Sequence, residues 1–116
     1  MTVIGHWIGG GRVAGESGRT GPVFNPAIGE PIREVAFAGA AEVDNAVRTA
    51  RAALPEWVAT PPIRRARVMF RLKELLERHM DELAALVTEE HGKTLADARG
   101  AISRGLEVVE FACGIP

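Results

Sequence analysis

The sequence predicts a mainly α-helical domain with a small N-terminal β-hairpin and one further short strand. Apolar residues recur at spacings of three and four through most of residues 40–113, which is the period of helices that face a core on one side. A glycine run at residues 9–11 separates two short segments of β type. The chain has 116 residues, 47% hydrophobic and 25% charged, which are ordinary values for one globular domain.

The first strand is expected within residues 2–8, where apolar and β-branched side chains alternate loosely. The chain should return over residues 12–14 as the second strand of a hairpin, because the glycines between supply the positive φ angles that such turns need. Residues 16–22 are expected to form a loop. Asn25-Pro26 with Gly29 predicts a turn, and residues 31–37 alternate again as the further short strand.

The first helix is expected to begin beyond Gly39 and to stop at Pro55. The second should start at residues 60–62 (TPP), because proline is tolerated in a first helical turn. The apolar stripe that follows runs for about thirty residues, which is long for one globular helix. We therefore expect a break near His79, with Glu82 three residues later to cap the next helix.

Gly92 should end the third helix, and Thr94 with Asp97 predicts a capping box for the last one, which closes at Gly114 and Pro116. One side of the last helix is apolar and consists of Leu95, Ala98, Ile102, Leu106, Val109 and Cys113. An adjoining side is built from small or apolar residues, namely Ala101, Gly105, Val108 and Ala112. So short a chain can hardly cover both sides, so we expect exposed apolar faces and self-association.

Composition excludes several classes of partner. The formal net charge of −1 gives no long-range field toward nucleic acid or an anionic membrane, and Arg64, Arg65 and Arg67 are expected to form a solvated face. No apolar run approaches the roughly 20 residues that span a bilayer, and no signal-peptide pattern is present. A single cysteine fits a reducing compartment. We expect a cytoplasmic protein with no nucleic-acid or membrane partner.

Nucleotide and metal motifs are weak. Residues 9–14 (GGGRVA) match the dinucleotide fingerprint formally, but no helix follows, so a hairpin turn is favoured. Residues 10–17 approach a P-loop, but Glu16 occupies the lysine position and would repel phosphate. The histidines at 6, 79 and 91 share no short spacing, and there is no second cysteine. We assign no metal-binding or cofactor-binding residue to this chain.

Two side chains remain as candidates for chemistry. Cys113 lies on the apolar stripe, so a buried core position is favoured over a reactive thiol in a small redox or hydrolytic protein. Arg104 stands between Gly100 and Gly105. It either pairs with Glu107 on the helix surface, worth a few tenths of a kcal/mol, or directs its guanidinium fork at a substrate carboxylate. The residues alone favour the surface pair.

The order of several motifs resembles the N-terminal segment of the aldehyde dehydrogenase superfamily. These motifs are residues 25–30 (NPAIGE), the helix over residues 40–53, Trp57, the helix that begins RRAR at residue 64, and residues 89–94 (EEHGKT). The ending, residues 104–116 (RGLEVVEFACGIP), is similar to the CoA-acylating methylmalonate-semialdehyde dehydrogenases. The sequence departs at Ile28, where threonine is usual, and at Ala101, where glutamate is common.

The resemblance implies that residues 1–116 are an incomplete domain, the N-terminal part of the NAD-binding domain in an α/β aldehyde dehydrogenase fold. Enzymes of the family are several hundred residues long, and their catalytic cysteine lies beyond the stretch matched here. No catalytic residue is therefore expected in this chain, which should be inactive alone. The implied reaction oxidises a semialdehyde to an acyl-CoA, with NAD and CoA as cosubstrates and Arg104 as the substrate-binding residue.

The implied partners are the remainder of the dehydrogenase chain and further copies in a homo-oligomer. The alternative is a non-catalytic helical module, for binding or oligomerisation, that derives from the family but has lost its chemistry.

Overall fold

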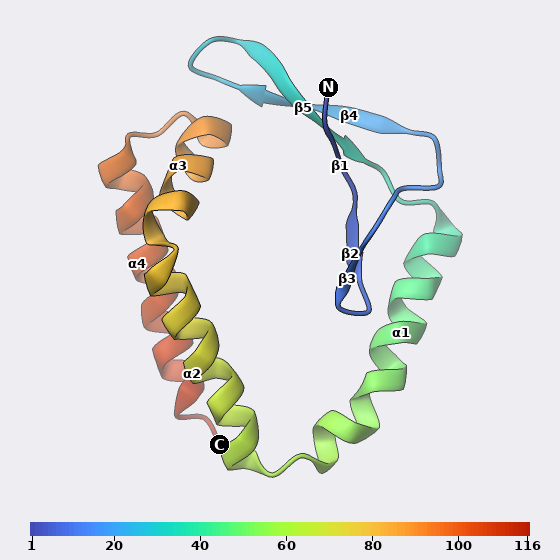
Figure 1. Cartoon of the computed structure of the whole chain (residues 1–116), viewed down its shortest axis with the longest axis vertical. Coiled ribbons are helices and arrows are strands. Elements are labelled where there is room, and N and C mark those ends of the chain that lie inside the picture. Colours follow the sequence, from blue (N-terminus) through green and yellow to red (C-terminus); the bar gives the residue numbers. More distant parts are fainter. The chain divides into compact units, whose positions relative to one another are not determined.

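The computed structural model describes residues 1–116, in which five short strands precede four helices (Figure 1). The strands are β1 (Val3–Ile4), β2 (His6–Ile8), β3 (Gly11–Val13), β4 (Thr20–Asn25) and β5 (Glu30–Ala36). The helices are α1 (Ala40–Ala59), α2 (Pro62–Arg78), α3 (Met80–His91) and α4 (Leu95–Cys113). The chain forms two compact units, Met1–Trp57 and Val58–Pro116. The predicted mainly helical fold with short N-terminal strands is confirmed.

The N-terminal hairpin forms as predicted, from β2 and β3. These strands pair antiparallel, and the turn consists of Gly9 and Gly10, whose φ angles are 64° and 81°. Two consecutive positive φ angles are the requirement of the tight hairpin turn, and glycine meets it without strain. The expected first strand is divided at Gly5. The backbone of Val13 approaches Gly5 so closely that a Cβ there would collide with its carbonyl.

A three-stranded sheet has the order β1-β5-β4, with β5 parallel to β1 and antiparallel to β4. The predicted turn between β4 and β5 is present, and Gly29 adopts a φ of 71° there. The expected loop over residues 16–22 is wrong from Thr20 onward, because Thr20 and Pro22 pair with Ala36 and Glu34 of β5. A proline is tolerated in β4 because this strand lies at an edge of the sheet.

The predicted end of the first helix at Pro55 is wrong, because α1 continues to Ala59. A proline inside a helix removes one backbone hydrogen bond and favours a kink, but it does not have to end the helix. The carbonyl that loses its partner belongs to Arg51, an exposed residue, so water can solvate it. No residue of α1 is buried.

The remaining helix ends lie where local signals place them. The break at His79 separates α2 from α3, and Gly92 ends α3 with a left-handed φ of 82°. The Thr94 hydroxyl accepts a hydrogen bond from the Asp97 N–H at 3.2 Å, so that half of the predicted capping box is formed. Glu82 does not cap α3 as expected. Its carboxylate lies 3.1 Å from the Nδ1 atom of His79, whose backbone N–H already donates to Leu75.

Mostly small residues form the core of the Val58–Pro116 unit, where α4 packs against both α2 and α3. Its buried side chains are Ala66, Ala84, Ala98, Leu106 and Cys113. Ala98 and Ala84 are 0% and 1% exposed, so the helix backbones approach closely at these positions. The core interpretation of Cys113 is confirmed. Leu95 was expected on the buried stripe of α4 but is half-exposed, because it lies in the first turn of the helix.

Candidate functional site

Arg104 lies in the middle of α4 and is exposed. It precedes the buried Leu106 by two residues, which places it about 200° around the helix, on the face opposite the core. Its guanidinium forms no hydrogen bond and no ion pair, so the expected surface pair with Glu107 is not present in this structure. A planar group with five N–H donors is therefore available on this face.

The two glycines beside Arg104 have different surroundings. A Cβ added at Gly100 would lie 3.8 Å from the Nη1 atom of Arg104, whereas one added at Gly105 would meet nothing within 4 Å. The guanidinium thus extends back over the preceding turn, which is the usual direction of a long side chain on a helix. Each glycine costs roughly 1 kcal/mol of helix propensity relative to alanine. Together they leave the backbone on both sides of Arg104 uncovered.

Apolar side chains continue the face of α4 that carries Arg104. Val108 and Phe111 follow one and two turns later, with exposed fractions of 67% and 75%. A guanidinium next to an apolar surface can bind a carboxylate through two parallel N–H···O bonds, while the apolar wall contacts the rest of a small molecule. The arrangement suits a short ligand with one acidic end. Cys113 lies nine residues after Arg104, on the opposite, buried face, so the structure does not bring the two candidates together.

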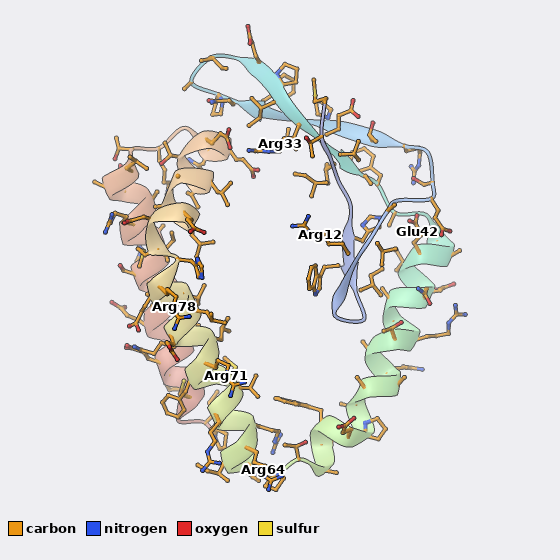
Figure 2. The ribbon with its side chains drawn as sticks, in the orientation of Figure 1. Arg12, Arg33, Glu42, Arg64, Arg71 and Arg78 are labelled. Atoms are coloured by element: carbon orange, nitrogen blue, oxygen red, sulfur yellow. The ribbon has the colours of Figure 1, made fainter.

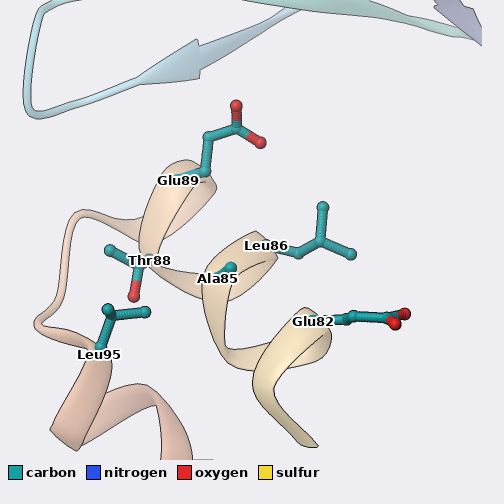
Figure 3. Close-up of a pocket in the computed structure, with 6 residues that line it drawn as sticks. All are labelled: Glu82, Ala85, Leu86, Thr88, Glu89 and Leu95. Atoms are coloured by element: carbon teal, nitrogen blue, oxygen red, sulfur yellow. The ribbon is translucent and has the colours of Figure 1, made fainter. Parts of the chain in front are cut away.

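Two hollows lie among the last three helices. One, of about 430 Å³, is almost wholly apolar and is lined by Leu76, Leu83, Leu86, Val87, Ile102, Gly105, Leu106 and Val109. The other, of about 650 Å³, is lined by Glu82, Ala85, Leu86, Thr88, Glu89 and Leu95 (Figure 3). Neither hollow is lined by Arg104 or by Cys113. We therefore assign no catalytic role to either hollow.

Charged side chains lie along the exposed surface of α2. The expected solvated basic face holds for Arg64 and Arg67, which are exposed, whereas Arg65 is partly buried. Figure 2 shows Arg64, Arg71 and Arg78 along the length of α2. Lys73 joins α2 to α4, since its ammonium lies 2.5 Å from Glu77 and 3.4 Å from Glu110. The hydrogen bond that Lys73 donates to Glu77, followed by the one it donates to Glu110, raises the pKa of Lys73 above its usual value.

A polar cluster around Glu42 was not predicted from the sequence. Glu42 lies in the first turn of α1 (Figure 2), and its carboxylate accepts hydrogen bonds from the backbone N–H groups of Gly39 and Glu16. The spacing from Gly39 to Glu42 is that of an N-cap residue and the third helical residue of a capping box, and this signal was available in the sequence. Glu16 and Glu42 are 26 positions apart, so no local sequence pattern predicts the contact between them.

The glycine motif of residues 9–14 makes the hairpin turn described above, as expected. In the P-loop-like stretch the backbone N–H of Glu16 donates to Glu42, a carboxylate. No group of three or more His, Cys, Asp or Glu side chains gathers in a way that could hold a metal ion. None of the helices is both long enough and apolar enough to cross a membrane.

The model of the aldehyde dehydrogenase family matches residues 13–116. A malonate-semialdehyde dehydrogenase from Pseudomonas aeruginosa is 47% identical over all 116 residues of this chain. A malonate-semialdehyde dehydrogenase from Geobacillus kaustophilus is 50% identical over 111 residues. The chain spans 23% of the length of each of these relatives.

The comparison with solved structures also finds semialdehyde dehydrogenases. A protein from Sinorhizobium meliloti, provisionally described as a methylmalonate-semialdehyde dehydrogenase and solved with NAD, superposes on the whole chain with a TM-score of 0.97 and 53% identity. The methylmalonate-semialdehyde dehydrogenase of Oceanimonas doudoroffii superposes with a TM-score of 0.96 and 52% identity. The chain covers 24% of each of these two structures. With the family match extending over residues 13–116, the chain belongs to the aldehyde dehydrogenase family.

Proposed function

We propose that this chain is the N-terminal portion of an NAD-dependent, CoA-acylating dehydrogenase that oxidises malonate or methylmalonate semialdehyde to an acyl-CoA. Family membership, with identities of 47% to 53% to proteins described as acting on these two semialdehydes, supports the substrate class. The NAD complex of the Sinorhizobium meliloti protein supports the nicotinamide cosubstrate. On this proposal residues 1–116 are an incomplete part of the NAD-binding domain.

Arg104 is the residue of this chain that binds the substrate. The observation that carries this assignment is its exposed guanidinium, which has no acidic partner and lies over Gly100 at the edge of an apolar face. Malonate semialdehyde has a carboxylate at one end and an aldehyde at the other. Two N–H···O bonds to the carboxylate fix the direction in which the aldehyde points, and orientation of this kind accounts for a large part of many enzymatic rate enhancements.

The reacting groups come from outside these residues. Cys113 is buried and unsuited to attack an aldehyde. When bound, NAD accepts the hydride and CoA accepts the acyl group, but no residue of this chain is assigned to either. The glycines that resemble a dinucleotide motif are committed to a hairpin turn. The contribution of this chain is to bind and orient the acidic end of the substrate.

The proposed partners are the rest of the dehydrogenase polypeptide and further copies of the enzyme. Support comes from large apolar side chains that stay exposed on every helix. Those at least half exposed are Val43, Val47, Leu54, Val58, Ile63, Val68, Phe70, Leu95, Val108 and Phe111. Exposed apolar surface of this amount favours association with another polypeptide.

A chimeric enzyme tests the proposal directly. This chain would replace the matching 116 residues of the Pseudomonas aeruginosa relative, and NADH formation from malonate semialdehyde would be followed with and without CoA. We expect NADH formation that depends on CoA. A folded chimera with no turnover would contradict the proposal and favour the alternative, a non-catalytic binding or oligomerisation module.

The role of Arg104 is tested in the same chimera. Arg104→Ala should raise KM for malonate semialdehyde by about 10- to 100-fold, since a hydrogen bond to a charged group contributes about 1.5–3 kcal/mol. KM for propanal, which has no carboxylate, should stay within about twofold. Ser103→Ala, at the neighbouring exposed position, is the matched control. Equal KM values for malonate semialdehyde in wild type and Arg104→Ala would refute the assignment and leave the reaction itself unaffected.

A further inference from the structure

One carboxylate joins two segments of the Met1–Trp57 unit that are far apart in sequence. The Oε2 atom of Glu42 accepts a hydrogen bond from the N–H of Gly39 at 2.6 Å, and Oε1 accepts one from the N–H of Glu16 at 2.8 Å. Gly39 directly precedes α1, and Glu16 lies in the loop that leaves the hairpin. Both bonds are charge-assisted, which makes them stronger than bonds between neutral groups.

His6 of strand β2 completes the cluster. Its Nε2 atom lies 3.4 Å from Oε1 of Glu42, and the two side chains are 19% and 10% exposed. Nε2 is buried and has no hydrogen-bond partner of its own, so the carboxylate is the polar group that it faces. An imidazolium at this position would form an ion pair with Glu42.

The loop from residue 15 to residue 19 depends on polar contacts. The Ser17 hydroxyl donates to the carbonyl of Phe37, and Nη2 of Arg19 donates to the carbonyl of Ala38 at 3.1 Å. Of the three side chains that attach this loop to the start of α1, only that of Glu42 changes its charge between acid and neutral pH.

Apolar packing between the hairpin and α1 is incomplete. A hollow of about 130 Å³ remains there, lined by Ile8, Val13, Glu16, Ala41, Glu42 and Asn45. Because no residue of α1 is buried, few apolar contacts can replace the hydrogen bonds of the Glu42 carboxylate if these are lost.

We propose that Glu42 is a proton-operated latch. As a carboxylate it holds the hairpin and the following loop, residues 6–16, against the start of α1, and on protonation it releases them. The charged or titratable groups around it are His6 from β2, with Glu16 and Arg19 from the loop. Glu16 contributes its backbone N–H to the cluster while its own side chain is exposed.

The direction of the pH dependence follows from the hydrogen bonds. The backbone N–H of Gly39, then that of Glu16, lower the pKa of Glu42 below 4.5, and His6 acts in the same direction. A carboxyl whose pKa is lower in the folded state stabilises that state above its unfolded pKa, and this stabilisation is lost as the pH falls through the folded pKa. The latch is therefore closed at neutral pH and opens below pH 4.5.

Amide hydrogen exchange of the isotope-labelled chain tests the latch. At neutral pH, Glu42→Gln should speed exchange at the amides of Glu16 and Gly39 by at least about tenfold, because both lose a charged acceptor. The amide of Gly92, which donates to Thr88 in the other unit, should change by less than about twofold. Glu16→Gln is the matched control, since it removes a nearby charge but keeps the backbone donor. Equal exchange rates in the two variants would overturn the proposal.

A second measurement needs no variant. In an acid titration of the wild-type chain, the amide chemical shifts of Glu16 and Gly39 should move together, with a common midpoint below pH 4.5. Shifts that do not titrate together, or that share a midpoint at or above 4.5, would overturn the proposal even if Glu42→Gln failed to fold.

Discussion

The two units of the chain are stabilised by different forces. In Met1–Trp57 the only buried hydrophobic side chain is Ala36. Hydrogen bonds that Ser17 and Arg19 donate, and one that the Glu42 carboxylate accepts from the N–H of Glu16, attach the loop to the start of α1. In Val58–Pro116 the three helices meet through small buried side chains. We call Met1–Trp57 the strand unit and Val58–Pro116 the helical unit. The stability of the strand unit should depend on the charge of Glu42, whereas the stability of the helical unit should depend on side-chain volume in its core.

The largest expected effect comes from added volume in the helical core. Ala84 is 1% exposed, whereas Ala85, the next residue of α3, is exposed. Ala84→Leu should destabilise the helical unit by about 1–3 kcal/mol, because the three additional carbon atoms of leucine cannot fit between close backbones. Ala85→Leu is the matched control and should change stability by less than about 0.5 kcal/mol. Urea unfolding followed by far-ultraviolet circular dichroism measures both.

The same pair of variants sharpens the comparison between the units. Hydrogen exchange at the Glu16 amide should be unaffected by Ala84→Leu if the strand unit depends on its own hydrogen bonds. Equal destabilisation by Ala84→Leu and Ala85→Leu would mean that side-chain volume does not limit the packing of α3.

A smaller effect is expected at the start of α4. Thr94→Ala removes the hydroxyl that accepts from the Asp97 N–H and should cost about 1 kcal/mol, with faster exchange at that amide. Thr94→Ser keeps an acceptor oxygen and should recover most of the loss. If serine and alanine were equally destabilising, the hydroxyl cap would not be the cause. This cap is the counterpart in the helical unit of the Gly39 bond to Glu42.

The smallest expected effect is on the pH dependence of stability in the helical unit, through the ion pair of Lys73 and Glu110. Lys73 has a raised pKa, so its contribution is complete below the unfolded value and is lost as the pH rises through the folded value, above 10.5. Glu110→Gln should make the urea midpoint less dependent on pH in this alkaline range. The change should be slight because Glu110 is half-exposed. Glu74→Gln, which removes the partner of Arg78, is the control and should leave the alkaline dependence unchanged.

Local rules predicted the helix boundaries well where the signal lies within a few residues. The break at His79, the left-handed Gly92 and the Thr94 cap are set by nearby backbone groups, so their sequence patterns are sufficient. The predictions were wrong where contacts between segments distant in sequence, or the tolerance of a helix for proline, decide the structure. Gly21 and Pro22 have little β propensity, and they continue the strand from Thr20 because β5 pairs with them. Pro55 weakens α1 but does not end it.

In the candidate site, too, some features could be predicted from the sequence and others could not. Its position on α4 and the isolation of Arg104 between glycines were visible in the sequence. The absence of an ion pair with Glu107, and the extension of the guanidinium over Gly100, required coordinates because a helical arginine has several rotamers. The cluster at Glu42 required them more strongly, since it joins residues that only the folded chain brings together.

The placement of the two tryptophans has an experimental consequence. Trp7 and Trp57 both belong to the strand unit, the chain has no tyrosine, and the helical unit therefore has no strong intrinsic fluorophore. The tryptophans are 69% and 44% exposed, so their emission in the native state should already be close to that of an indole in water. A fluorescence melt would thus show little change and would miss the unfolding of α2, α3 and α4, whose loss has to be followed by a method that detects the helical backbone.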